Sequence, residues 1–393
     1  MKLVCGKKSI LLIVVTIFCM QFVSAFTVSG HIAGLPNGTK LLIRRFEMGW
    51  DTYRVDSCVV TDGKFSFTGN VPGGPHFHWI DILDGPYSNR LIALVIDNDD
   101  QINIEGDTSI DKMPIGGING FITVTGSKVN NGFFRLFSAL KFHNQCKIRI
   151  DKAINSVTDY DKNADLVDGY IQAKKLVTKA WESLLIDPYT YFDNFPCLLS
   201  QEHDYVRSEH LSILPKIYEG LTEYDKNTKF GKLLKEDAAL AINQMFPDFK
   251  LQSTQGNSIQ LKEIVAKSKA VIVLFWANNS YKIDDTQQQL LDLYKKYHSR
   301  GLDIIGISSD TSEKKWKISS ADLPWYNVSD LKGANGIVEK VYHEYGFAAM
   351  PNTTVVLLDD NGKIIAWDLS RIELCYYLDR TVGNKAGIAS VNY

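Results

Sequence analysis

The sequence predicts an α/β fold at the C-terminus, preceded by an antiparallel β domain and a helical middle segment. Three observations predict this order: short strands separated by turn residues come first, apolar residues at helical spacing follow, and an unbroken apolar strand lies in the last part. The 393 residues are enough for two or three domains. We expect domains at residues 26–125, 126–245 and 246–393, after a leader at residues 1–25.

The composition and charge are those of an ordinary globular protein. Hydrophobic residues make up 45% of the chain and charged residues 22%, which excludes a disordered, collagen-like or coiled-coil chain. The 43 Lys and Arg residues against 45 Asp and Glu residues give a formal net charge of −2. Because nucleic-acid binding rests on clustered positive charge, the chain is not expected to bind nucleic acid. No cofactor is expected either.

The first 25 residues have the features of a secretory signal peptide. Three lysines precede an almost unbroken apolar run from Ile10 to Val23, and the small residues Ser24 and Ala25 follow it. The run is shorter than the roughly 20 residues of a membrane-spanning helix. We expect cleavage after Ala25 and an exported chain, in the cell envelope, the periplasm or outside the cell, with no spanning segment. Lipid anchoring at Cys19 remains an alternative.

Residues 26–125 have the pattern of short strands joined by turns. β-Branched, aromatic or alternating apolar residues predict strands, and Gly, Pro, Asn and Asp lie between them. The strands are expected at residues 27–32, 40–45, 54–60, 65–67, 91–96 and 101–104. His76 and His78 would share one face if they lie on a strand. No nearby Cys or third His completes a metal site, so no metal is expected.

Residues 126–245 change to helical spacing. Apolar residues recur at intervals of three and four from Phe133, and the same pattern predicts helices at residues 166–185 and 233–245. Tyr189, Tyr191, Phe192 and Phe195 fit core packing better than a ligand platform. We therefore expect a helical linker domain.

Residues 246–393 alternate buried strands with helices. Ala270–Trp276 is a continuous apolar strand, of the kind that helices bury on both faces. A helix whose apolar face includes Leu290 and Tyr297 should end at Gly301. Further strands are expected at residues 302–307, 353–358 and 364–367, and helices at 312–319, 336–345 and 370–378. These elements describe a mixed sheet covered on both faces.

Six blocks of this segment occur in a fixed order. They are Pro247-Asp248-Phe249-Lys250-Leu251, Leu274-Phe275-Trp276-Ala277, residues 301–308, Leu323-Pro324-Trp325, residues 350–354 with Met350-Pro351, and Asp360-Asn361-Gly362-Lys363-Ile364. In this order they resemble the ResA/TlpA-like thioredoxin-fold proteins, the redoxin or AhpC/TSA group. The resemblance implies a thioredoxin-like fold and the thiol-disulfide oxidoreductase family. Residues 26–125 resemble the domain of unknown function that often precedes such modules in envelope proteins.

The resemblance fails at the expected active site. In this family a Cys-x-x-Cys motif stands at the start of a helix, where the helix dipole and free N–H groups stabilise a thiolate. Ser280 and Ile283 occupy the two cysteine positions here. Because disulfide exchange requires a thiolate, we expect no catalytic residue at this site. Ser280 is expected to cap the helix, since no adjacent His would activate its hydroxyl.

The family's cis-proline matches Pro351. In relatives this proline lies opposite the cysteine loop, and its neighbour's backbone can pair with an extended peptide. A structural role in the turn before strand 353–358 is the favoured explanation, and peptide binding is the alternative. The resemblance implies a binding groove formed by Trp276, Asn279, Ser280, Ile283, Met350 and Pro351.

Three functional hypotheses follow. The first is an exported thioredoxin-fold protein that is redox-inactive at the usual site and acts as a binding or scaffold module for an extended peptide or an envelope protein. The second is an active thiol-disulfide oxidoreductase in cell-envelope redox homeostasis. It would use a non-standard cysteine, and of Cys58, Cys146, Cys197 and Cys375 only the last lies in the thioredoxin-like part. The third assigns ligand binding to the β domain.

Overall fold

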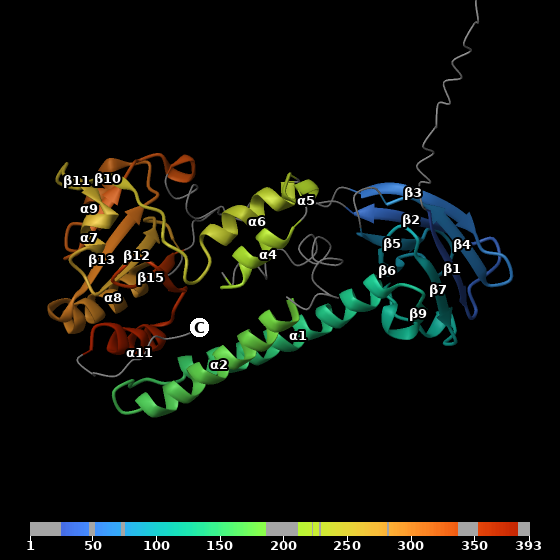
Figure 1. Ribbon diagram of the computed structural model, residues 1–393, viewed down its shortest axis with the longest axis horizontal. Coiled ribbons are helices and arrows are strands. Elements are labelled where there is room, and N and C mark those ends of the chain that lie inside the picture. Colours follow the sequence, from blue (N-terminus) through green and yellow to red (C-terminus); the bar gives the residue numbers. More distant parts are fainter. Residues whose placement is uncertain are drawn as a thin grey trace, which may run out of the picture.

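The computed structural model describes residues 25–46, 52–71, 75–185, 211–221, 223–227, 229–280, 283–336 and 353–383. Residues 1–24 of the expected signal peptide lie outside this part, as do Cys197, the aromatic residues between Tyr189 and Phe195, residues 337–345 of an expected helix, and Met350 and Pro351. Figure 1 shows the β domain at one end of the molecule, the α/β domain at the other, and helices between them.

The N-terminal domain contains two sheets within the described residues. One sheet has the order β4-β1-β7-β9 and the other β3-β2-β5-β6-β8. Most neighbours are antiparallel, as predicted, but β1 with β7 and β6 with β8 run parallel. The strands are β1 (Phe26–Ile32), β2 (Lys40–Phe46), β3 (Thr52–Val59), β4 (Lys64–Gly69), β5 (His76–Ile82), β6 (Arg90–Ile96), β7 (Gln101–Gly106), β8 (Gly116–Gly117) and β9 (Thr123–Thr125).

The alternation of β1 builds the core of this domain. Phe26, Val28, Gly30 and Ile32 are buried, whereas the alternate residues Thr27, Ser29 and His31 are partly exposed. Gly30 allows a close approach, because a Cβ at this position would meet the Phe65 ring at 2.4 Å. Two-residue periodicity therefore fixes which face of the strand enters the core.

Strand β5 carries both histidines, of which His78 is fully buried. Its Nδ1 lies 2.8 Å from the carbonyl oxygen of His76. Burial lowers the pKa of His78 to about 3, so the ring is neutral at physiological pH. Within the described ranges, no group of three or more His, Cys, Asp or Glu residues is arranged to hold a metal ion.

Within the described residues, the middle segment contains a long helical hairpin and three shorter helices. The helices are α1 (Lys128–Asn155), α2 (Ala164–Leu185), α4 (Leu214–Gly220), α5 (Glu223–Asn227) and α6 (Lys229–Ala239). Ser127 caps α1 by accepting a hydrogen bond from the N–H of Asn130 at 3.0 Å. None of the helices that the structure describes is both long and apolar enough to cross a membrane.

The helix predicted to reach Met245 ends earlier, at Ala239. Asn243 has a positive φ of 71°, and its N–H donates to the carbonyl of Ile364 at 2.8 Å. The N–H of Phe246 donates to Gly362 at 2.9 Å. These long-range bonds to the C-terminal hairpin replace the helical ones, so tertiary structure overrides the local apolar pattern.

In the described part of the C-terminal domain, a seven-stranded sheet has the order β11-β10-β14-β13-β12-β15-β16. Strands β12, β13 and β14 are parallel and the other neighbours antiparallel, which confirms the predicted mixed sheet. Every residue of β12 is buried, as its unbroken apolar run predicts. The elements are β10 (Lys250–Ser253), β11 (Ser258–Gln260), α7 (Leu261–Val265), β12 (Ala270–Trp276), α8 (Ile283–Tyr297), β13 (Leu302–Ser308), α9 (Glu313–Ser319), β14 (Tyr326–Ser329), β15 (Thr354–Leu358), β16 (Ile364–Trp367) and α11 (Arg371–Thr381).

Helix α11 begins with the predicted capping box. The Oγ of Ser370 accepts from the N–H of Glu373 at 3.4 Å, and the carboxylate of Glu373 accepts from the N–H of Ser370 at 2.9 Å. The other Glu373 oxygen binds Lys174 of α2 at 2.7 Å, and Lys174 also binds Asp151 of α1 at 2.7 Å. A charged network therefore joins the helical hairpin to the C-terminal domain.

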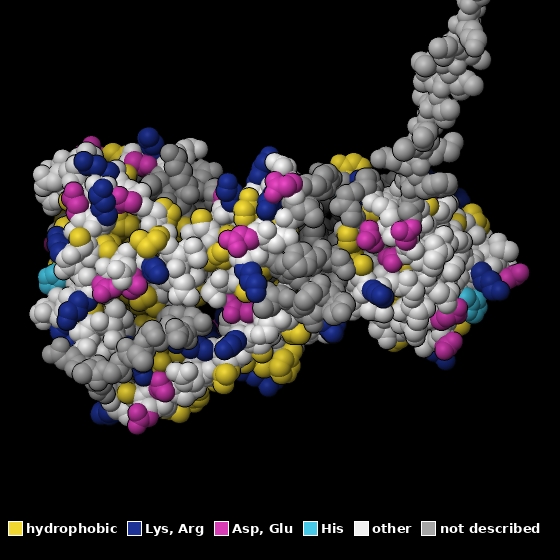
Figure 2. Space-filling view, viewed as in Figure 1, with side chains coloured by type: hydrophobic (Ala, Val, Ile, Leu, Met, Phe, Trp, Pro, Cys, Tyr) yellow, Lys and Arg dark blue, Asp and Glu magenta, His cyan; other side chains and the backbone are white. Residues whose placement is uncertain are grey.

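The surface shows no concentration of one charge on the face in Figure 2, where Lys and Arg side chains alternate with Asp and Glu. This distribution agrees with the near-zero net charge of −2.

Candidate functional site

The candidate site is the turn that leaves β12 and leads into α8. The Oγ of Ser280 accepts a hydrogen bond from the N–H of Ala277 at 2.9 Å. The N–H of Ser280 donates in return to the carbonyl of Ala277 at 3.0 Å. Helix α8 begins at Ile283, so Ser280 closes the preceding turn and is not the residue directly before the helix. Its oxygen is therefore occupied by local backbone bonding.

A carboxylate from the next strand end holds this turn in place. Asp310 accepts from the backbone N–H of Asn278 at 3.2 Å and from its Nδ2 at 2.7 Å. Ser308 donates its hydroxyl to the same carboxylate at 2.8 Å, and the hydroxyl of Ser319 donates to the Oδ1 of Asn278. These bonds tie the turn to β13 and α9. These side-chain hydrogen bonds hold the turn, and its sequence from Ala277 to Ile283 contains no cysteine.

The predicted groove residues differ in exposure. Trp276, Ser280 and Ile283 are only 1%, 6% and 7% exposed, whereas Asn279 is exposed. Met350 and Pro351 lie outside the described residues, so their position opposite the turn stays a prediction. Of the described groove residues, Asn279 is the one whose side chain solvent and a partner can reach.

A cavity of about 240 Å³ lies between α8 and β15, and the sequence did not predict it. Thr286 and Gln289 of α8, Thr353 before β15, and Asp368 after β16 contribute to its lining. Asp368 has a positive φ of 48°, and burial raises its pKa to about 6. A strained backbone and a perturbed carboxyl beside a cavity are features of binding sites.

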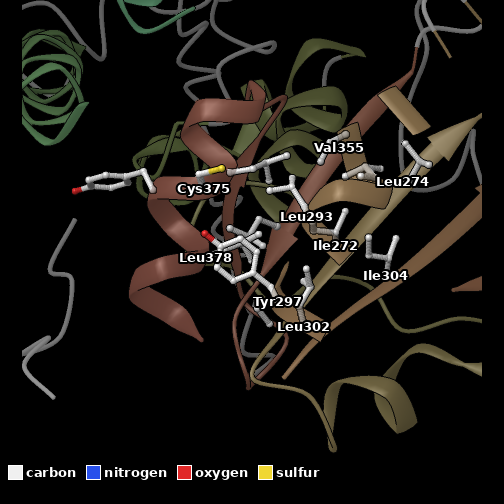
Figure 3. Packing of buried hydrophobic residues seen from close by; sticks show 14 of the residues in the cluster. Ile272, Leu274, Leu293, Tyr297, Leu302, Ile304, Val355, Cys375 and Leu378 are labelled. Atoms are coloured by element: carbon white, nitrogen blue, oxygen red, sulfur yellow. The ribbon is translucent and has the colours of Figure 1, made fainter. Parts of the chain in front are cut away.

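Cys375 lies in the hydrophobic core of the C-terminal domain. It is 5% exposed and belongs to the cluster that includes Leu293, Tyr297 and Leu378, as Figure 3 shows. Burial raises the pKa of this thiol above its ordinary value, so the reactive thiolate is disfavoured at neutral pH. Among the described cysteines, Cys58, Cys146 and Cys375 are all free of disulfides.

The sequence alone did not find Asp310 or Asp368. Asp310 follows strand β13, and the carboxyl ends of the parallel strands β12 and β13 meet at one edge of the sheet. This edge is where ligand and catalytic groups of α/β proteins gather, so the position of Asp310 was an available signal. Asp368 follows the last strand of a hairpin, and no pattern in the sequence marks its unusual φ.

Comparisons with known proteins agree with this domain arrangement. The AhpC/TSA family matches residues 242–367, and the domain of unknown function DUF4369 matches residues 26–133. The thiol-disulfide oxidoreductase ResA of Bacillus thuringiensis subsp. konkukian is 27% identical over 137 residues, which cover 34% of this chain and 73% of that protein. The chloroplastic peroxiredoxin Q of Sedum lineare is 29% identical over 151 residues, covering 35% and 70%.

A solved structure also matches the C-terminal domain. The C-terminal domain of a putative thiol-disulfide oxidoreductase from Bacteroides thetaiotaomicron is 30% identical, with 36% of this chain and 95% of that chain covered and a TM-score of 0.32. Residues 242–367 therefore match the AhpC/TSA family and are similar to the thiol-disulfide oxidoreductase ResA, and residues 26–133 before them match DUF4369.

Proposed function

We propose that this chain is an exported thioredoxin-fold protein that is redox-inactive at the family's usual site and acts as a binding or scaffold module. One observation carries the proposal: Ser280 and Ile283 stand where the sulfurs would be, and the Oγ of Ser280 accepts the N–H of Ala277 at 2.9 Å. A mixed-disulfide intermediate has no sulfur to form on there. The proposed module thus has the thioredoxin-like fold without thiol-disulfide exchange at this site.

The burial of Cys375 argues against the alternative enzyme. A non-standard oxidoreductase needs an accessible thiolate, whereas this thiol is 5% exposed and its pKa is raised by burial. Its neighbours Leu374 and Leu378 belong to the same apolar cluster. These facts support a packing role for Cys375.

The binding role rests on the surface beside the turn. Asn279 is exposed, and the cavity of about 240 Å³ lies along the first turns of α8. We infer that an extended peptide of an exported protein binds here, with its backbone paired beside Pro351 and a side chain in the cavity. Apolar walls from Leu290, Val355 and Leu374 would accommodate an apolar side chain, with Asp368 at the side.

Export is supported by the basic and apolar pattern of residues 1–25, which is typical of a secretory signal peptide. Phe26, the first residue of β1, is fully buried, and it directly follows the expected cleavage point at Ala25. N-terminal sequencing of the protein from fractionated cells should therefore give Phe26 and find the chain outside the cytoplasm. A chain that keeps Met1 and stays in the cytoplasm would contradict export.

Insulin reduction by dithiothreitol tests the lack of redox activity. The natural chain should not accelerate insulin precipitation, whereas a Ser280→Cys/Ile283→Cys variant should, because it restores a thiol pair at the start of α8. Turnover by the natural chain that disappears in Cys375→Ser would establish the alternative enzyme. Unfolded variants are identified by circular dichroism.

Peptide binding is tested separately with a labelled, extended and cysteine-free peptide. Gln289→Arg should weaken binding because the larger side chain fills the cavity that Gln289 lines. Gln288→Arg is the matched control, since this exposed neighbour on α8 does not line the cavity. Equal binding to both variants would place the peptide elsewhere.

A further inference from the structure

The cavity between α8 and β15 has a single charged group in its lining among the described residues, the carboxyl of Asp368. The rest of this described lining is uncharged and contains no lysine, arginine or histidine. Its apolar members are Leu290, Val355, Leu369 and Leu374, and its polar members are Thr286, Gln289 and Thr353. The cavity therefore combines apolar walls with one acidic group.

Solvent reaches Asp368, although protein atoms enclose it closely. Asp368 and Gln289 are exposed, and Leu369 is partly exposed, so a ligand can touch all three. The surrounding protein atoms raise the pKa of Asp368 to about 6, as expected for a carboxyl inside a cleft. The N–H of Asp368 donates to the carbonyl oxygen of Val355 at 2.8 Å and fixes the residue beside β15.

Asp368 also lines a larger cavity, of about 560 Å³, between the helical hairpin and the C-terminal domain. On that side Lys147 of α1 attracts the carboxylate, but its effect on the pKa is smaller than that of burial. Lys174 pairs there with Asp151 and Glu373, each at 2.7 Å. Within the described residues, no ion pair includes Asp368. The other charged residues of that lining are Lys175, Lys179 and Glu182.

A cation on an apolar stem matches this combination of groups. An ionised carboxylate in an enclosed place is stabilised by a cationic hydrogen-bond donor, and such charge-assisted bonds are stronger than neutral ones. The side chain of lysine has a stem of four carbons, which can lie along apolar surface while the ammonium stays near water. A purely apolar group would remove water from the carboxylate without replacing its hydrogen bonds.

The size of the cavity indicates one side chain and not a whole small molecule. Its volume of about 240 Å³ is below the range of roughly 300–1,000 Å³ that is typical of small-molecule sites. The occupant is therefore a side chain of a larger ligand, in agreement with a bound peptide.

We propose that this cavity selects a lysine side chain of the bound peptide, with its stem against Leu369 and Val355 and its ammonium paired with the carboxylate of Asp368. This inference rests on the peptide binding proposed above, and it assigns the specificity of that binding to Asp368.

Fluorescence anisotropy of the full chain tests the selection with three labelled peptides. Their sequence is Ser-Thr-Val-Xaa-Val-Thr-Ser, in which Xaa is lysine, norleucine or glutamate. Norleucine keeps the four carbons of lysine and lacks the ammonium. The lysine peptide should bind about tenfold more tightly than the norleucine peptide, because it adds one charge-assisted hydrogen bond, and the glutamate peptide should bind most weakly.

Asp368→Asn removes the charge with little change in shape. Asparagine also tolerates the positive φ of 48° at this position, so the variant should fold. It should lose the preference for lysine, with about tenfold weaker binding of the lysine peptide and no loss for the norleucine peptide. Asp322→Asn is the matched control, since this exposed residue lines neither cavity and its substitution should leave the preference intact.

The pH dependence of binding gives a second measurement that needs no variant. Between pH 5 and 7 the affinity of the natural chain for the lysine peptide should rise, because protons compete with the ammonium for the carboxylate of Asp368. The peptide lysine, with an ordinary pKa of about 10.4, stays charged throughout. The norleucine peptide should show no such rise.

The two proposals fail in different ways. If the lysine and norleucine peptides bind equally, or if Asp368→Asn keeps the preference while folded, the selection of lysine is wrong and peptide binding stands. If none of the three peptides binds, the peptide binding and the inference that rests on it are both wrong.

Discussion

Ser280 stands at the position of the family's first active-site cysteine, and Cys375 is the one cysteine in the sequence of residues 246–393. The surroundings of these two residues differ. Both are nearly inaccessible, at 6% and 5% exposure. Ser280 lies just before the start of α8, where backbone N–H groups and the helix dipole favour an anion. Cys375 lies inside α11, among apolar side chains that disfavour an anion. The surroundings that favour a thiolate are therefore at position 280, whereas the sulfur is at position 375.

The largest expected effect is on thiol reactivity. In a Ser280→Cys variant, the new thiol should react with iodoacetamide at least about tenfold faster than Cys375 at neutral pH, because a helix N-terminus lowers a thiol pKa. Cys375 should react only at alkaline pH, since its pKa is raised and the thiolate forms later in the titration. Mass spectrometry of labelled peptides over a pH series measures both rates.

A matched thiol sharpens that comparison. Ser320 is 4% exposed and stands at the C-terminal end of α9, where the dipole opposes an anion. A cysteine placed there by Ser320→Cys should label as slowly as Cys375. Equal rates at positions 280 and 320 would show that the helix terminus does not set the reactivity.

The hydrogen bonds that Asp310 accepts from the turn should contribute strongly to stability. Asp310→Ala removes the carboxylate that accepts from the N–H and Nδ2 of Asn278, and it should lower the free energy of unfolding by about 2–3 kcal/mol. Chemical denaturation of the full chain measures this change. Asp322→Ala, at an exposed position, should change stability by less than about 0.5 kcal/mol. A similarly small change for Asp310→Ala would mean that the hydrogen bonds of Asp310 do not hold the turn.

Cys375→Ser tests the packing role. The substitution places a hydroxyl among apolar neighbours and should cost about 1–2 kcal/mol of unfolding free energy. Cys375→Ala serves as the control, since it removes the sulfur without adding a polar group. A serine variant as stable as the natural chain would indicate that the side chain has a polar partner.

The smallest effect is expected at the start of α11. Ser370→Ala removes the cap acceptor for the N–H of Glu373 and should destabilise the protein by about 1 kcal/mol. Thermal unfolding followed by circular dichroism detects this change. Ser370→Thr should restore most of the loss, because threonine keeps a hydroxyl that can cap the helix and still donate to the Glu373 carboxylate. A failure of this rescue would assign the effect to something other than capping.

Sequence patterns predicted what depends on neighbours along the chain. The unbroken apolar strand Ala270–Trp276 and the capping box of Ser370 and Glu373 both appear in the structure. Asn278 and Asp310 are 32 residues apart, so no local pattern announced their contact. The parallel pairing of β1 with β7 likewise depends on how distant strands meet. Strand β5 was not predicted as a strand, although His76 and His78 alternate as strand residues do.

Helix α1 contacts β6 at one end and α11 at the other, and its 28 residues span about 42 Å at 1.5 Å per residue. The length of α1 therefore sets the separation of the two outer domains. Inserting a single alanine into its exposed middle would lengthen it by about 1.5 Å and turn its far end by roughly 100°, carrying Asp151 away from Lys174. Both the distance and the relative orientation of the outer domains thus depend on the number of residues in α1.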